Sequence, residues 1–102
     1  MTQAAVARLD ELTPGTPRLL EVQGRRVVLT RVGDAVYACA DACAHKGGPL
    51  SEGKQSGTRL ACPWHGWHYD VRTGQCVFPG RGASVATYPV TIADGEIRVE
   101  VS

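Results

Sequence analysis

The sequence lacks any long hydrophobic run and any excess of charge of one sign. No stretch approaches the roughly 20 apolar residues of a membrane-spanning helix, and the first ten residues do not resemble a secretory signal. Eleven Lys and Arg residues against ten Asp and Glu residues leave a net charge of +1, which offers no electrostatic surface for nucleic acid or anionic lipid. These absences predict a cytoplasmic protein that binds neither nucleic acid nor a membrane.

The usual signs of an enzyme are missing as well. The sequence shows no nucleophile–base pair, no phosphate-binding loop and no open mononuclear metal site. We therefore expect the chain to be one component of a larger system and not an enzyme by itself. Its 102 residues predict a single domain, 1–102, with one modest core.

Glycine is abundant, and it separates short apolar runs of strand length. Two-residue connections at Gln23-Gly24, Gly33-Asp34 and Asp94-Gly95 stand between such runs, as is typical of β-hairpins. The final run, Glu96–Val101, alternates between polar and apolar residues and predicts a half-buried strand. The best helical stretch, Val6–Leu12, is short. The pattern as a whole predicts an all-β sandwich or barrel.

Three segments do not fit the strand pattern and read as loops. They are Asp41–Ser56, Cys62–Trp67 and Phe78–Gly82. Loops held on a small rigid scaffold commonly carry function.

Two of these loops pair a cysteine with a histidine. Cys43 and His45 form a C-x-H motif, Cys62 and His65 form a C-x-x-H motif, and sixteen residues separate the two. Thiolate and imidazole groups both bind metals, so a hairpin that brought the loops together would create one metal site. A structural zinc site is one alternative, although zinc fingers usually place both cysteines on one knuckle. Buried cysteines beside surface histidines are the other.

The paired motif, followed by Gly66 in a C-P-W-H-G segment, resembles the Rieske iron–sulfur proteins. More narrowly, it is similar to the soluble Rieske-type ferredoxins of bacterial ring-hydroxylating dioxygenase systems. The resemblance covers essentially the whole chain, including Pro49–Gly53 and Tyr69-Asp70 after the two motifs. It implies the Rieske fold, an antiparallel β base domain with a small cluster-binding subdomain of loops over about residues 40–80.

The same resemblance implies a cofactor and its ligands. One [2Fe–2S] cluster per chain would be bound by Cys43 and Cys62 on one iron and by His45 and His65 on the other. Neutral imidazoles in place of two thiolates make the centre less negative and raise its reduction potential above that of all-cysteine ferredoxins. The histidines would be the point at which electrons enter and leave.

The function implied is that of a soluble electron carrier. It would pass single electrons from a flavin-dependent reductase to a terminal oxygenase, docking transiently near His45 and His65. The alternatives are a Rieske-like small subunit of an assimilatory nitrite reductase, a redox-sensing Rieske protein and a non-redox zinc-binding module.

Departures from the respiratory Rieske proteins are also informative. Those proteins have an additional cysteine in each loop, joined as a disulfide, and Gly48 and Trp64 stand at these positions here. Trp67 replaces a serine that donates a hydrogen bond to the cluster, whereas Tyr69 matches a tyrosine that donates to a cysteine sulfur. The resemblance therefore implies an electron carrier with a lower reduction potential than that of the respiratory Rieske proteins.

Six residues have expectations that do not concern cluster ligation. Cys39 and Cys76 are expected as buried thiols, with a disulfide between them as the alternative, and His68 as a surface residue. Trp64 and Phe78, with Trp67, would either shield the cluster from water or form an apolar rim for docking.

Overall fold

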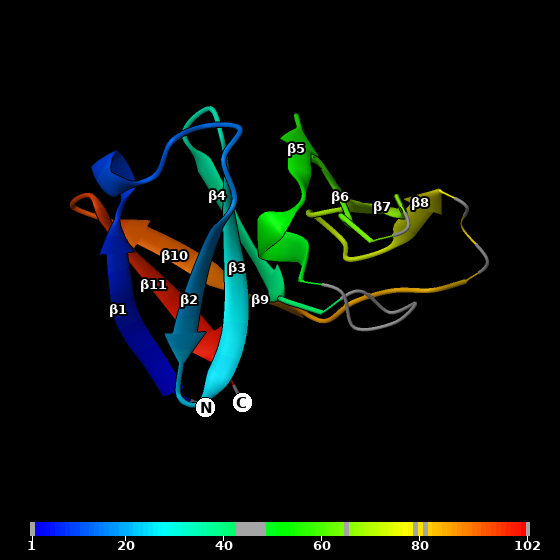
Figure 1. The fold of residues 1–102 in the computed structure, drawn as a ribbon. Helices are drawn as coiled ribbons and strands as arrows, with labels where there is room; N and C mark the ends of the chain where they lie inside the picture. Colours follow the sequence, from blue (N-terminus) through cyan, green and yellow to red (C-terminus); the bar gives the residue numbers. More distant parts are fainter. Residues whose placement is uncertain (1, 43–48, 65, 79, 81, 102) are drawn as a thin grey trace.

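The chain forms three antiparallel sheets in the computed structural model, which describes residues 2–42, 49–64, 66–78, 80 and 82–101 (Figure 1). The first sheet has the order β1 (Thr2–Arg8), β11 (Glu96–Val101), β10 (Val90–Ala93). The second has the order β2 (Arg18–Val22), β3 (Arg25–Val32), β4 (Ala35–Ala40), β9 (Thr87–Tyr88). The third has the order β5 (Lys54–Ser56), β6 (Arg59–Ala61), β7 (His68–Asp70), β8 (Cys76–Phe78).

The three predicted hairpins are confirmed. Gln23-Gly24 joins β2 to β3, Gly33-Asp34 joins β3 to β4, and Asp94-Gly95 joins β10 to β11. At Gln23-Gly24 and Asp94-Gly95 both turn residues have positive φ, as the twist of a two-residue hairpin requires. Local turn chemistry thus defines the register of these three strand pairs.

The sequence shows no convincing helix, and the N-terminal strand takes up part of the stretch with the most helical character. Residues Val6–Leu12 were the best helical stretch of the sequence, but strand β1 extends through Arg8 and only η1 (Leu9–Glu11) is helical, as a 3-10 turn. β1 is a strand because it pairs with β11 along its length, with a register shift between Ala5 and Ala7. Such a distant partner outweighs a weak local pattern. Among the described residues, no helix is long and apolar enough to cross a membrane.

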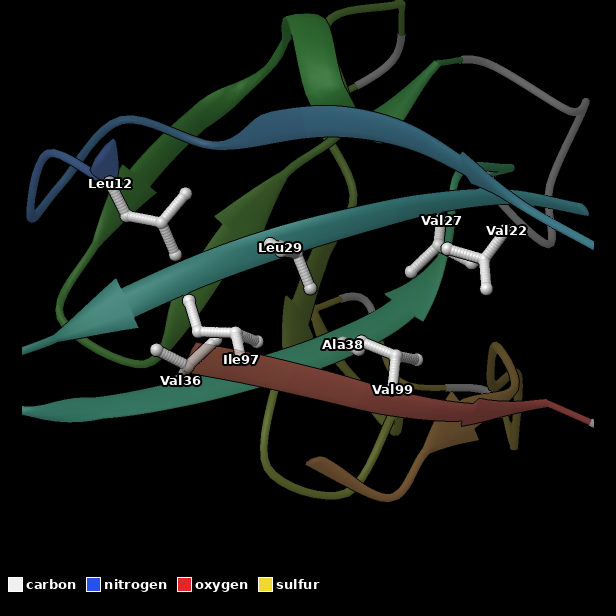
Figure 2. Close-up of a cluster of buried hydrophobic side chains, with 8 residues drawn as sticks. All are labelled: Leu12, Val22, Val27, Leu29, Val36, Ala38, Ile97 and Val99. Carbon is white, nitrogen blue, oxygen red and sulfur yellow. The ribbon is translucent and has the colours of Figure 1, made fainter. Parts of the chain in front are cut away.

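Strand β3 is buried on both faces. Val27 and Leu29 contribute to one core, and Val28 between them contributes to another. The first, here called the base core, lies between the first two sheets (Figure 2) and consists of Leu12, Val22, Val27, Leu29, Val36, Ala38, Ile97 and Val99. The second core lies between β3–β4 and the third sheet and consists of Val28, Cys39, Leu50, Leu60, Cys62, Tyr69, Val71 and Cys76.

The third sheet gives the expected cluster-binding region more structure than loops alone. Its strands have three residues each and alternate little in polarity, so the sequence pattern did not predict them. Leu60 and Tyr69 pair across β6 and β7, and both side chains are fully buried in the second core. This core anchors the third sheet on the larger one.

Candidate metal centre

One of the four predicted ligands belongs to the described part of the chain. Cys62 follows β6 directly and its residue is 3% exposed. Cys43, His45 and His65 lie outside the described residues. Elsewhere among the described residues, no three His, Cys, Asp or Glu side chains lie close enough together to bind a metal ion.

A tight connection between β6 and β7 holds Cys62. The Cys62 amide donates a hydrogen bond to the carbonyl oxygen of Trp67 over 2.7 Å, and the Gly66 amide donates to the carbonyl oxygen of Cys62 over 3.0 Å. Gly66 has a φ of 70°, a conformation that glycine adopts without strain. The segment that contains the C-x-x-H motif is therefore closed on itself by its own backbone.

The chain after the first motif packs tightly against β6. The 3-10 helix η2 (Leu50–Glu52) buries Leu50 completely and is followed by Gly53. A Cβ atom on Gly53 would overlap the carbonyl oxygen of Ala61, so only glycine permits this approach. The close contact brings the segment after the first motif next to Cys62.

A cavity of about 310 Å³ opens beside Cys62. Its lining is formed by Glu52, Gly53, Lys54, Ala61, Cys62 and Pro63. A buried thiol in a backbone-closed turn, next to open space, is compatible with the thiolate ligation of an iron–sulfur cluster. The donor types of the two motifs, thiolate and imidazole, also fit a cluster of the Rieske type.

Asp41 is a buried acid that the sequence patterns did not single out. Its side chain is completely inaccessible to solvent, and it lies between β4 and the first motif. One carboxylate oxygen accepts a hydrogen bond from the Ser51 amide over 2.6 Å, and the other lies 3.2 Å from a guanidinium nitrogen of Arg26. The only signal in the sequence was an acid two residues before Cys43.

The aromatic residues divide into two groups. Trp64 and Phe78 are 57% and 62% exposed, and Val77 beside Phe78 is 41% exposed. Trp67 is half-buried and packs against the second core. His68 was expected at the surface but is half-buried. Its ring meets that of Phe78 edge to face, with 6.0 Å between the two ring centroids. Trp64 and Phe78 are thus exposed to solvent, whereas Trp67 contributes to packing.

The two cysteines outside the motifs are buried thiols, as expected. Cys39 and Cys76 both belong to the second core, and neither forms a disulfide. Burial raises the pKa of the Cys39 thiol to about 12, and the negative charge of Asp41 adds to this shift. The Cys76 thiol lies 3.2 Å from the carbonyl oxygen of Phe78. Both residues act as small apolar side chains in the core.

Comparison with known proteins defines the family. A model of the Rieske [2Fe–2S] domain matches residues 2–89. The ferredoxin subunit of anthranilate 1,2-dioxygenase from Burkholderia cepacia is 32% identical in an alignment of 107 positions that covers 99% of each chain. A methylxanthine N1-demethylase of Pseudomonas putida is 38% identical over 73 residues, 70% of this chain, but the match spans only 20% of that longer protein.

Solved structures agree with the family match. The ferredoxin of carbazole 1,9a-dioxygenase from Nocardioides aromaticivorans IC177 superimposes with a TM-score of 0.92, at 34% identity and with complete coverage of both chains. A chain from a complex of reduced oxygenase and oxidised ferredoxin of carbazole 1,9a-dioxygenase gives a TM-score of 0.88 at 32% identity, covering 95% of this chain and all of that one.

The chain belongs to the Rieske [2Fe–2S] family. Its cofactor is a [2Fe–2S] cluster of the Rieske type, and its fold is the Rieske fold that the resemblance implied. A structure described as the small subunit of an NADPH nitrite reductase matches 99% of this chain, with a TM-score of 0.85 at 26% identity. The anthranilate and carbazole dioxygenase relatives of matching length are ferredoxin components. The chain is thus an electron carrier and not the catalytic component of a system.

Proposed function

We propose that Cys43 and Cys62 bind one iron of the cluster and that His45 and His65 bind the other. The proposal is carried by the pairing of a C-x-H with a C-x-x-H motif in a chain of the Rieske family. The burial of Cys62 beside a cavity supports it. When bound, a cluster with this ligand set supplies reversible one-electron chemistry.

We propose further that the carrier takes electrons from a flavin-dependent reductase and delivers them to a terminal ring-hydroxylating oxygenase in the cytoplasm. Support comes from the full-length likeness to the ferredoxins of the anthranilate and carbazole dioxygenase systems. The likeness to a chain from an oxygenase–ferredoxin complex supports transient docking to an oxygenase.

Trp64, Val77 and Phe78 form the apolar part of the proposed docking face around His45 and His65. Trp64 belongs to the second motif, and the other two belong to β8, whose neighbour β7 is separated from that motif by two residues. Weak redox encounters use small interfaces, whose centres are rich in aromatic residues. We assign this face, together with β5–β8, to a cluster-binding subdomain over about residues 40–80.

The ligand assignment is tested on the purified protein. It should contain about two irons and two sulfides per chain, in keeping with one [2Fe–2S] cluster. Reduction should give a Rieske-type electron paramagnetic resonance (EPR) signal. The variant His65→Cys should shift that signal toward the all-cysteine type or lose the cluster, because ligand identity determines the electronic structure. Stoichiometric zinc without sulfide would overturn the assignment.

The docking face is tested by electron delivery to an oxygenase of this class. Trp64→Ala and Phe78→Ala should slow electron transfer while the iron content stays at the wild-type level. Leu19→Ala is the matched control, since Leu19 is a 40% exposed apolar residue on β2. If Leu19→Ala slowed delivery and the two aromatic variants did not, the docking face would lie elsewhere.

A further inference from the structure

We propose that Asp41 is a positioning residue whose buried carboxylate clamps the base of the segment that carries Cys43 and His45. This inference rests on the ligand set proposed above. It concerns how the first pair of ligands is held, which neither the sequence motifs nor the comparisons address.

The contacts of Asp41 tie together three parts of the fold. Its backbone amide donates to the carbonyl oxygen of Arg26 in β3 over 3.2 Å, and its carboxylate contacts the Arg26 guanidinium. Its other carboxylate oxygen accepts the Ser51 amide of η2 over 2.6 Å. A single side chain thus joins the end of β4, the start of β3 and the helix after the first motif.

The bond between Asp41 and Ser51 closes the chain around the first motif. Cys43 and His45 both lie between these two residues in the sequence. Only Ala42 stands between Asp41 and the first cysteine in the sequence. Any movement of the clamp therefore acts directly on the backbone that presents the first cysteine.

A buried carboxylate is not required for core packing, which an apolar side chain would provide. Of the charged residues described, Asp41 alone is buried, and burying a carboxylate costs free energy unless it is paired and hydrogen-bonded. Ser51 lies in the first turn of a three-residue helix, where the amides have no acceptor within the helix. The carboxylate therefore satisfies a donor that the local structure leaves open, and it fixes the position of η2.

The test compares two substitutions of Asp41 in the cluster-loaded protein. Asp41→Asn keeps a side-chain oxygen that can accept the Ser51 amide, whereas Asp41→Ala removes the acceptor. Val99→Ala is the control for lost stability, because Val99 is fully buried in the base core, away from the clamp. The readouts are the EPR line shape of the reduced protein and the rate of iron release to a chelator.

We expect Asp41→Ala to broaden or split the EPR signal and to release iron faster than Val99→Ala. Asp41→Asn should restore the wild-type line shape, because it restores the hydrogen bond. A wild-type signal in Asp41→Ala, with iron release no faster than in Val99→Ala, would overturn the proposal. If the wild-type protein itself gave no Rieske-type signal, the proposed ligand set would have failed instead.

A second measurement needs no variant. Hydrogen exchange of the wild-type holoprotein, read by mass spectrometry at residue resolution, should show the Ser51 amide protected to a degree similar to Val28 in the buried strand β3. Rapid exchange at Ser51, with Val28 protected, would show that the clamp does not hold and would also overturn the proposal.

Discussion

Removal of the Tyr69 hydroxyl should lower the reduction potential of the cluster. Tyr69 lies in β7, opposite Leu60 and Cys76 of the neighbouring strands, and its side chain is completely buried. Its resemblance to the tyrosine that donates to a cysteine sulfur in the respiratory Rieske proteins predicts such a bond here. Tyr69→Phe keeps the ring that fills the core and removes only the donor.

The expected change in reduction potential follows from the energy of one hydrogen bond to a charged group. One-electron reduction adds a negative charge to the centre, so a donor directed at its sulfur stabilises the reduced state more than the oxidised state. A hydrogen bond to a charged acceptor contributes about 1.5–3 kcal/mol. Because about 1.4 kcal/mol corresponds to ~59 mV for one electron, the loss should lower the potential by roughly 60–130 mV. Complete burial keeps water from replacing the lost donor.

The assay is a spectroelectrochemical titration of the wild type and the variant, with iron content measured on the same samples. Tyr88→Phe is the matched control, since Tyr88 packs against the base core. We expect the wild-type potential in the lower part of the family range of about −150 to +300 mV. An unchanged potential in Tyr69→Phe with the cluster intact would refute the reasoning, as would a wild-type potential near the top of the range.

Three further predictions concern the site and its support. Trp67→Ser should raise the potential by roughly tens of millivolts in the same titration, because a hydroxyl would add a donor at that position; a lower potential would contradict this. A mild thiol reductant should leave the Tm of the holoprotein unchanged in calorimetry, because Cys39 and Cys76 form no disulfide. Gly57→Ala should lower the free energy of unfolding by about 1–2 kcal/mol, because Gly57 has a φ of 59° and no neighbour that a Cβ atom would meet. Gly53→Ala should lower it by more, because the added Cβ atom would overlap the carbonyl oxygen of Ala61. Equal losses for the two variants in urea denaturation would show that the contact with Ala61 is unimportant.

The features that the sequence predicted well depend on neighbouring residues. A turn such as Asp94-Gly95 defines its hairpin through its own backbone conformation, so the pattern was sufficient. β1 and the third sheet could not be predicted in this way. Strand β5 (Lys54–Ser56) is three polar residues long, and it is a strand because it pairs with β6. Pairing of this kind depends on the rest of the fold.

The same distinction applies to the candidate site. The two cysteine–histidine motifs were evident because the cysteine and the histidine of each are close in sequence and chemically distinctive. The role of Asp41 was not evident from the sequence, because its partners are distant: Arg26 lies fifteen residues before it and Ser51 ten residues after it. A lone acid has no spacing that distinguishes a buried clamp from a solvated surface residue.

The burial of β3 on both faces couples the two halves of the molecule thermodynamically. Because Val28 stabilises the second core and Val27 and Leu29 stabilise the base core, neither core can open without disturbing the strand they share. Binding of the cluster to the folded state should therefore stabilise the whole chain by mass action, and not only the region that holds the metal. Loss of iron in the cell would then favour unfolding and proteolysis of the first two sheets as well. The molecules that stay folded would be those that retain the cluster.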